Sequence, residues 1–516
     1  MVQATLASLL NYALLSLGAA QVEYKIDIPP RKEMGDYATN AAILAARQLK
    51  KNPLELAQIL TGKIKELDKD NIFNKLEVAK PGFINFFLND SFVHKNIQEI
   101  VIKDHVWGVG GSGIGSRILL EFVSANPTGP LHVGHGRWAV VGDCLARLLK
   151  AAGYKVESEF YVNNIGNQVE KLWASVEAAR AGQPTPENGY GGAYIKEVEG
   201  DNKEAVLQFI LGQQKETLEK LGVSFDRFFN ESELHAKGEV KEAVSRLEQR
   251  HKTMIEGGAV WFKSMEMGDD KNRVLVREDG NPTYFAADLA YHLDKFSRGY
   301  DRLINIWGTD HHGYVKRLKA AVEAMGLPAE NLEIIIGQLV TLYRGNEPVR
   351  MSKRTGEMVT LQEVIDEIGA DATRFFFAAS DVNSHMDFDL ELAKKQSSEN
   401  PVYYVQYAHA RICSILNKSE IRIPHSEINL SELTHPAERE LMLKLLSYPD
   451  VVESAARLRH PHRITEYGKE LATVFHHFYE KCRVIGNPAR VVLVDASRIT
   501  LRNVLELLGI TAPVSM

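Results

Sequence analysis

Two closely spaced histidines are the first residues in this sequence whose types and positions could do chemistry. His132 and His135 flank Gly134 after a loop with two prolines, and a helical pattern follows them. The N-terminus of a helix attracts phosphate through its free N–H groups and its dipole. Gly134 leaves room for a ribose or a base near the backbone. The pattern predicts a nucleotide-phosphate site, and the simpler alternative is a pair of surface histidines that cap a helix.

A basic loop far downstream adds a second candidate. Met351, Ser352 and Lys353 stand between Arg350 and Arg354. A lysine held among arginines can follow the negative charge that develops on a leaving pyrophosphate. Taken alone, such a loop is more often a solvated turn. Together with the histidine pair, it favours a site where a nucleoside triphosphate loses pyrophosphate.

The elements around these residues alternate between strand and helix. The expected strands are 118–123, 155–162, 303–307 and 332–336, and the expected helices are 134–152, 284–296 and 314–325. Such alternation predicts a parallel sheet with right-handed crossovers, whose ligands bind at the carboxyl ends of the strands. Residues 203–257 are mostly helical in pattern, which indicates an insertion between the two halves of the sheet.

The flanking regions differ from this core. An amphipathic helix is expected over 6–20, further helices over 38–50 and 53–66, and a strand over 82–88. A glycine cluster at 108–115 is better interpreted as a linker than as a dinucleotide fingerprint, because a strand-like segment follows it. After about residue 360, helical patterns dominate to the end. We therefore expect units at 1–110, at 117–360 with the insertion at about 183–270, and at 361–516.

Composition excludes several classes of protein. The 516 residues are 45% hydrophobic and 25% charged, which is ordinary for a globular chain and excludes a largely disordered one. A net charge of -6 gives no overall basic signal for nucleic acid, although a local patch could still bind it. The cysteines Cys144, Cys413 and Cys482 form no C-x-x-C pair, so we expect neither disulfides nor a cysteine-rich zinc site. A cytoplasmic protein without a membrane span is the expectation.

Several motifs together resemble the class I aminoacyl-tRNA synthetases, and the bacterial arginyl-tRNA synthetases in particular. The motifs that carry the resemblance, in chain order, are Gly35–Asn40, Pro81–Asn85, Ala125–Leu131, His132–His135, Tyr284–Asp288, Trp307–His312, Met351–Lys353 and Asp371–Arg374. The resemblance covers most of the chain. It implies a Rossmann-like catalytic domain with a helical insertion, an N-terminal α+β domain that binds the tRNA elbow, and an all-α C-terminal bundle that binds the anticodon.

The resemblance also implies a reaction. An arginine carboxylate would attack the α-phosphate of ATP to give arginyl-adenylate and pyrophosphate, and the arginyl group would then pass to tRNA with release of AMP. His132, His135 and Lys353 are the implied catalytic residues. The implied ATP-binding residues are Gly134, His135, Met351, Ser352 and Lys353. Mg²⁺ would accompany ATP, no structural metal is expected, and the expected state is a monomer. Arg350 and Arg354 depart from the family's usual Lys-Met-Ser-Lys-Ser loop.

Arginine is a planar cation with five N–H donors, which suits a carboxylate partner. Tyr284 and Asp288 lie four residues apart on an expected helix and therefore share one side. The resemblance pairs Asp288 with the guanidinium and Tyr284 beside it, whereas the simpler alternative makes Tyr284 a core residue and Asp288 a solvated one. The residues implied for the ammonium and carboxylate are Glu121, Ser124 and Asn126. Contacts of Asp310 and His311 with ribose or substrate are a weaker implication.

Aromatic and basic residues on one later helix are candidates for tRNA contact. The candidates are Tyr403, Tyr407 and Arg411, with Tyr404 and His409 beside them. Such residues suit stacking on unpaired bases, but tyrosines at helical spacing equally suit packing between helices. A basic stretch over 457–463 could face phosphate or be merely solvated.

Three other functions stay open from the residues. A synthetase-like binding protein without catalysis should have lost at least one of His132, His135, Lys353, Tyr284 and Asp288, and all are present. A small nucleotidyltransferase would lack the long helical third and the lysine loop. A synthetase for cysteine would usually need a zinc site, which the three dispersed cysteines cannot form together.

Overall fold

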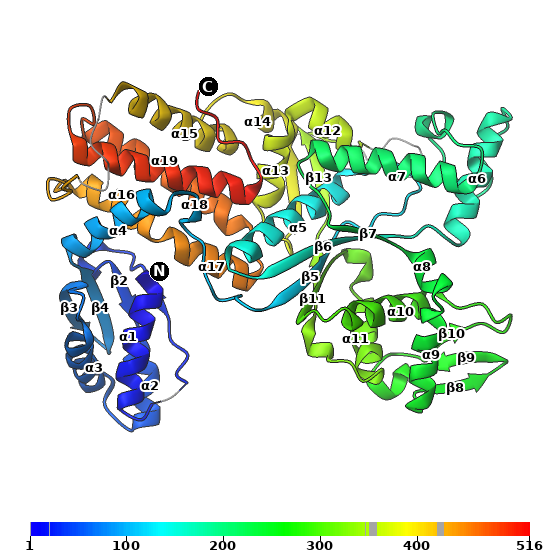
Figure 1. The fold of residues 1–516 in the computed structure, drawn as a ribbon, viewed down its shortest axis with the longest axis horizontal. Coiled ribbons are helices and arrows are strands. Elements are labelled where there is room, and N and C mark those ends of the chain that lie inside the picture. Colours follow the sequence, from blue (N-terminus) through cyan, green and yellow to red (C-terminus); the bar gives the residue numbers. More distant parts are fainter. Residues whose placement is uncertain (1, 20, 346, 350–358, 420–427) are drawn as a thin grey trace.

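The computed structural model describes residues 2–19, 21–345, 347–349, 359–419 and 428–516. Met351, Ser352 and Lys353 lie outside the described residues. In Figure 1 the chain forms an elongated molecule, with a small N-terminal unit beside a helical bundle at one end, a sheet in the middle and two projections at the other end. No helix in the described part of the chain combines the length and apolar character that crossing a bilayer requires.

The N-terminal unit packs helices against a four-stranded antiparallel sheet of order β1-β2-β4-β3. Its elements are α1 (Val2–Ser16), β1 (Ile26–Asp27), β2 (Tyr37–Thr39), α2 (Ala41–Leu49), α3 (Pro53–Leu67), β3 (Phe73–Ala79), β4 (Phe83–Leu88) and α4 (Asp90–Lys103). Asn52 caps α3 by accepting a hydrogen bond from the Leu54 amide. The helix expected over 38–50 begins only at Ala41, because Tyr37–Thr39 pairs with β4 as a strand.

The central sheet has five parallel strands in the order β12-β11-β5-β6-β7. These strands are β5 (Arg117–Glu121), β6 (Lys155–Val162), β7 (Arg227–Asn230), β11 (Arg302–Gly308) and β12 (Leu332–Gly337). The helices that accompany the sheet are α5 (Val133–Ala151), α10 (Tyr284–Ser297) and α11 (Tyr314–Ala324). From β5 the chain continues to β6 and β7 on one side, and it later adds β11 and β12 on the other. The order therefore reverses between β5 and β11, which is where such sheets bind ligands.

The expected helical insertion is only partly helical. Its helices are α6 (Asn167–Arg180), α7 (Lys203–Lys220), α8 (Glu231–Ala236) and α9 (Glu239–Gln249). Within it β7 pairs with β6 as an edge strand of the central sheet. A separate three-stranded antiparallel sheet follows, made of β8 (Thr253–Glu256), β9 (Ala259–Phe262) and β10 (Arg273–Val276). Two projections result, α6–α7 and α8–β10, which diverge from the sheet in Figure 1.

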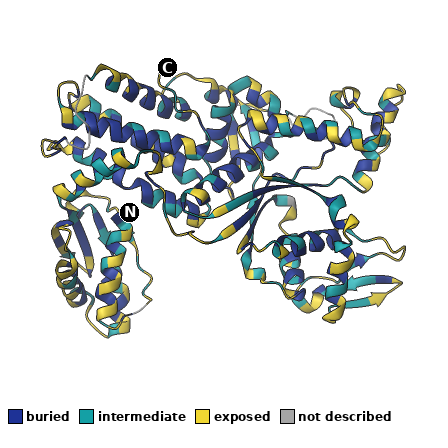
Figure 2. Ribbon diagram, in the orientation of Figure 1, coloured by how far each residue is buried: buried dark blue, intermediate teal, exposed yellow. Residues whose placement is uncertain are grey.

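Helices dominate after residue 360, as the pattern predicts, with one exception. The helices are α12 (Leu361–Ile368), α13 (Ala370–Ala378), α14 (Leu390–Lys394), α15 (Pro401–Lys418), α16 (Pro436–Leu446), α17 (Tyr448–Leu458), α18 (His462–Lys481) and α19 (Pro488–Leu508). The exception is β15 (Met386–Asp389), which pairs in parallel with β13 (Val340–Arg344). The long dark-blue stretch of α19 in Figure 2 marks the centre of the bundle core.

Arg374 joins the bundle to the sheet. Its side chain on α13 is 1% exposed, and it donates to the carbonyls of Leu508 at 2.7 Å and Leu221 at 3.0 Å and to the carboxylate of Asp143. Leu508 ends α19, Leu221 follows α7, and Asp143 lies on α5. One buried guanidinium thus fixes the bundle against the helix that begins at the histidine pair.

Candidate active site

The histidine pair begins α5 at the carboxyl end of β5. His132 is the N-cap residue: its Nδ1 accepts from the His135 amide at 3.3 Å, and His135 Nδ1 accepts from the His132 amide at 3.3 Å. The two rings stack with their centroids 3.6 Å apart. A neutral imidazole that accepts at Nδ1 carries its proton on Nε2. The capping alternative is therefore correct for the Nδ1 atoms, while the Nε2–H groups can still donate to a phosphate.

Gly134 and Thr360 fit closely around this pair. A Cβ on Gly134 would come within 3.0 Å of the His132 ring, so the stacked arrangement itself requires glycine. Thr360 forms a β-bridge with His132, and the Leu361 amide donates to the Leu131 carbonyl at 2.8 Å. The chain that resumes after the basic loop is thus joined directly to the histidine motif.

Tyr284 and Asp288 begin α10, which Thr283 caps. Tyr284 is 48% exposed, so it is not a core residue. Asp288 accepts a hydrogen bond from the Tyr314 hydroxyl on α11 and is not a solvated residue. Burial raises the pKa of Asp288 to about 7; the Tyr314 hydrogen bond opposes this rise, and the charges of Glu231 and Glu121 add to it.

Glu231 is a site residue that the sequence reasoning missed. It is the first residue of α8, it is 4% exposed, and burial raises the pKa of its carboxyl group against the effect of a Tyr161 hydrogen bond. Burial raises the pKa of Tyr161, and the charges of Glu231, Asp288 and Glu121 raise it further. The three carboxylates therefore surround one hydroxyl group.

The charge around Asp288 and Glu231 is not balanced. Among the residues that the structure describes, no Lys or Arg forms an ion pair with either carboxylate. His235 Nε2 lies 3.9 Å from Glu231 Oε1, but burial lowers the pKa of His235, so its ring is neutral at pH 7. An excess of buried negative charge suits a cationic ligand.

Glu121, Ser124 and Asn126 follow one another where β5 ends. Glu121 is 5% exposed and forms an ion pair with Lys295, a fully buried residue of α10, and it accepts from Ser124 Oγ at 2.8 Å. A buried strand carboxylate needs a cationic partner, and here the protein supplies one. Val123 and Ser124 have φ angles of 69° and 40°, a strained left-handed turn that separates Glu121 from the exposed Asn126.

Residues after β11 approach the same pocket. Asp310 and His311 lie in the short 3₁₀ turn Thr309–His311, as their position after a strand predicts. The His311 ring lies 5.5 Å from that of Trp307 and 6.4 Å from that of Tyr314, the residue that holds Asp288. The side chain of Asp310 lies outside the described residues.

The tRNA candidates separate into two groups. Tyr403 and Tyr407 stack at 6.1 Å on the outside of α15, and Arg411, one turn further, lies over the Tyr479 ring at 5.2 Å. These residues form one partly exposed face. His409, by contrast, is buried and bonded to the Pro513 carbonyl at 2.9 Å, which makes it part of the core.

The basic stretch over 457–463 neither faces open solvent throughout nor forms a free phosphate patch. Arg459 forms an ion pair with Glu333 of β12 at 3.2 Å, and Arg463 donates to the Ser454 hydroxyl. His460 lies 3.6 Å from Asp381. These contacts pack the stretch against the catalytic unit.

Protein-family models match nearly the whole chain. The arginyl tRNA synthetase N-terminal domain matches residues 2–88, the catalytic domain of class I (R) tRNA synthetases matches 96–189 and 191–400, and the DALR anticodon binding domain matches 405–516. The catalytic match thus ends at a later residue than 360, the end expected for the catalytic unit.

Curated relatives and solved structures agree with these matches. An arginine–tRNA ligase of Heliobacterium modesticaldum is 44% identical over 96% of this chain and 94% of its own length, and one of Moorella thermoacetica is 43% identical over 99% and 98%. The arginyl-tRNA synthetase structure from Thermus thermophilus superposes with a TM-score of 0.80 over all of both chains at 23% identity, which supports the fold. On its sequence, its fold and the geometry of its site, the chain belongs to the arginyl-tRNA synthetase family.

Proposed function

We propose that this protein joins L-arginine to its tRNA at the expense of ATP. The reaction forms arginyl-adenylate with release of pyrophosphate, and then passes the arginyl group to tRNA with release of AMP. Family membership supports the reaction class. The observation that carries the choice of arginine is the uncompensated pair of buried carboxylates, Asp288 and Glu231, beside the nucleotide motif.

On the nucleotide side, the chain's own groups bind and orient phosphate. The Nε2–H groups of His132 and His135 donate to phosphate oxygens at the N-terminus of α5, whose free amides add to the attraction. Gly134 keeps the rings stacked. Met351, Ser352 and Lys353 complete the ATP site in the proposal, with Lys353 following the leaving pyrophosphate, and Mg²⁺ arrives with ATP. Because no covalent enzyme intermediate is needed, catalysis consists of positioning and charge stabilisation.

On the amino-acid side, two carboxylates and two tyrosines define the guanidinium pocket. Asp288 is oriented by Tyr314, Glu231 faces the same space, and the exposed ring of Tyr284 covers the opening. A planar guanidinium can donate to both carboxylates at once, whereas a point-like ammonium cannot reach both with the same geometry.

The backbone end of arginine lies toward the end of β5 in this proposal. Ser124, Asn126 and Glu121 bind the ammonium and carboxylate groups. Lys295 already neutralises Glu121, so Glu121 orients the Ser124 hydroxyl as well as facing the ligand. Asp310 and His311 approach the ribose or substrate from the β11 side.

The tRNA contacts are proposed for both ends of the molecule. The face formed by Tyr403, Tyr407 and Arg411 stacks on anticodon bases, and the N-terminal unit, residues 1–110, binds the elbow. Residues 117–360 form the catalytic unit with its insertion, and 361–516 form the anticodon-binding unit. We further propose that the enzyme acts as a monomer in the cytoplasm.

The test is amino-acid-dependent exchange of pyrophosphate into ATP, measured for each of the twenty amino acids with and without total tRNA. The proposal expects exchange with arginine alone. If exchange appears only with tRNA, activation is coupled to tRNA binding; if it appears without tRNA, the enzyme stands and the coupling is absent. A Lys353→Ala variant, which should lose most of the exchange, is the control for a contaminating enzyme. Silence under both conditions would leave an RNA-binding protein without catalysis.

A further inference from the structure

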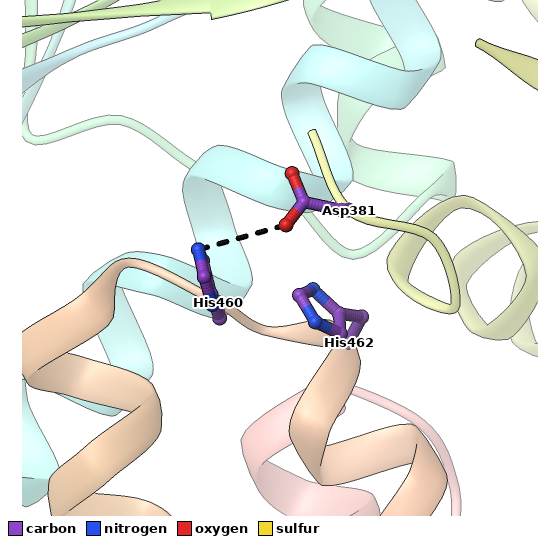
Figure 3. Close-up of side chains that lie close together, drawn as sticks. All are labelled: Asp381, His460 and His462. Atoms are coloured by element: carbon purple, nitrogen blue, oxygen red, sulfur yellow. Dashed lines mark ion pairs between the residues drawn. The ribbon is translucent and has the colours of Figure 1, made fainter. Parts of the chain in front are cut away.

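Three metal-ligating side chains converge outside the active site. Asp381 follows α13, His460 precedes α18, and His462 is the first residue of α18. His460 Nε2 lies 3.6 Å from Asp381 Oδ2, and one ligand atom from each of the three residues lies within 4.8 Å of the other two. Figure 3 shows all three side chains pointing into one space from two separate segments of the chain.

The Asp381 carboxylate is held in place by its own neighbours. Its Oδ1 accepts from the Asn383 amide at 2.8 Å and from Asn383 Nδ2 at 3.0 Å, and its backbone carbonyl accepts from Arg137 Nη2 at 2.8 Å. These bonds leave Oδ2 directed at the histidines. Metal-ligating carboxylates are commonly oriented by hydrogen bonds of this kind.

His462 provides a second, independent observation. Its Nδ1 atom is buried and has no hydrogen-bond partner among the described residues. Leaving a buried polar atom unpaired is costly, and a cation bound to it would remove that cost. The arginines on either side are engaged elsewhere, because Arg459 pairs with Glu333 and Arg463 donates to Ser454. Neither guanidinium is committed to the carboxylate of Asp381.

We propose that Asp381, His460 and His462 bind one divalent transition-metal ion, with Zn²⁺ as the best match. Two imidazoles and one carboxylate oxygen form a donor set typical of zinc, with water as the fourth ligand. Bonds of about 2 Å place tetrahedral ligands about 3.4 Å apart. Small rotations of the two partly exposed histidine side chains bring the three atoms to that separation.

The proposed ion joins two parts of the molecule. Asp381 lies within the segment that matches the catalytic domain, and both histidines lie within the segment that matches the anticodon-binding domain. A metal here is a clasp between these domains rather than a participant in the chemistry. The sequence analysis considered cysteines alone and expected no structural metal; the residues that meet here come from distant segments.

The test uses the full-length protein, stripped of metal by a chelator and titrated with Zn²⁺ by calorimetry without ATP. We expect one equivalent bound by the original protein and at least a tenfold loss of affinity in His462→Ala and in Asp381→Asn. His385→Ala is the matched control, because it removes the histidine of another His–Asp pair, His385 and Asp387, which are 3.3 Å apart with no second histidine. That variant should bind as the original does.

A second measurement does not depend on the variants folding. Co²⁺ added to the stripped original protein should give the intense visible absorption of four-coordinate cobalt, and Zn²⁺ should abolish it. Zinc should also raise the Tm of the original protein, because a ligand that binds only the folded state stabilises it. Absence of four-coordinate cobalt bands, or equal zinc affinity in the original protein and His462→Ala, would overturn the proposal.

Discussion

Two buried acidic clusters share helix α10, and their electrostatics are opposite. Glu159 on β6 is fully buried and accepts two hydrogen bonds from Arg298, at 2.6 and 2.8 Å, and one from Tyr291 at 2.7 Å. Burial would raise the pKa of Glu159, but Arg298 and Lys295 hold it below its usual value. Asp288, on the same helix as Tyr291, has its pKa raised to about 7.

The difference separates structure from function. The Glu159 cluster has its cations built into the protein, so its charge is balanced before any ligand arrives. The cluster of Asp288 and Glu231 lacks such cations among the described residues, and the folded protein bears the cost of that excess charge. A cationic substrate can compensate the second cluster alone. Four predictions test this contrast, in order of decreasing expected effect.

The largest effect is expected for Asp288→Asn. The variant keeps the shape of the pocket but removes the charge that faces the guanidinium, and such losses typically amount to about 3–4 kcal/mol. We expect kcat/KM for arginine in tRNA charging to fall by roughly 10²–10³-fold, while the KM for ATP changes less than threefold. Steady-state kinetics with each substrate varied in turn gives both numbers.

Asp294→Asn serves as the control on the same helix. Asp294 pairs with Arg298 at 3.0 Å, away from the pocket, so its removal should leave the KM for arginine nearly unchanged. Equal rises in the KM for arginine and for ATP in Asp288→Asn would contradict the assignment of Asp288 to the guanidinium.

Glu159→Gln should show the opposite profile. Removing one partner of a buried ion pair leaves the other charge uncompensated, which costs about 3 kcal/mol of stability. We expect a clearly lower Tm by calorimetry, with the KM for arginine within twofold of the original. Glu77→Gln breaks the exposed pair between Lys75 and Glu77, and its Tm should hardly move. A large rise in the KM for arginine in Glu159→Gln would remove the distinction between the clusters.

Glu231→Gln should have an intermediate effect. Glu231 shares the guanidinium with Asp288 in our proposal, and losing one of two charged acceptors costs about 1.5–2 kcal/mol. We expect the KM for arginine to rise about 10- to 30-fold. Glu233→Gln, two residues further on α8, is the control, because Glu233 caps the helix and pairs with Arg227. An unchanged KM in Glu231→Gln would leave Asp288 as the sole acidic contact.

Much of the catalytic unit could be predicted because its elements are local patterns. The strand expected over 155–162 is β6 with the same bounds, and apolar runs and helical spacing also located α10, α11 and β12. The four-residue strand β7 was missed because it is too short to show alternation; its pairing with β6 makes it a strand.

The site was predictable to the same extent. Spacing alone indicated that His132 and His135 meet, because both residues lie within one helical turn. Glu231 could not be found this way, since an acidic residue at the start of a helix already has an explanation in the helix dipole. Lys295 reads as a polar position on an amphipathic helix, and only the fold reveals its ion pair with Glu121. Contacts between distant elements leave no periodic trace in the sequence.

The smallest expected effect is a pH dependence of opposite sign for binding and for stability. A cationic ligand needs Asp288 ionised, and a pKa of about 7 means that ionisation is largely complete by pH 8. Arginine affinity should therefore rise about fourfold from pH 6.5 to pH 8 and level off above. The unfolded chain ionises Asp288 at a lower pH, so between the two pKa values the folded state holds the extra proton. Stability without arginine must then fall as pH rises toward 7.

Asp288→Asn isolates this contribution from that of all other groups. Subtracting the variant's pH profile from the original protein's should leave a stability difference that declines toward pH 7 and is flat above it. The arginine affinity of the variant, by contrast, should show no rise over the same range. If stability and arginine affinity instead changed in the same direction with pH, the buried carboxylate would already be balanced within the protein, as Glu159 is, and the excess charge could not be what selects the substrate.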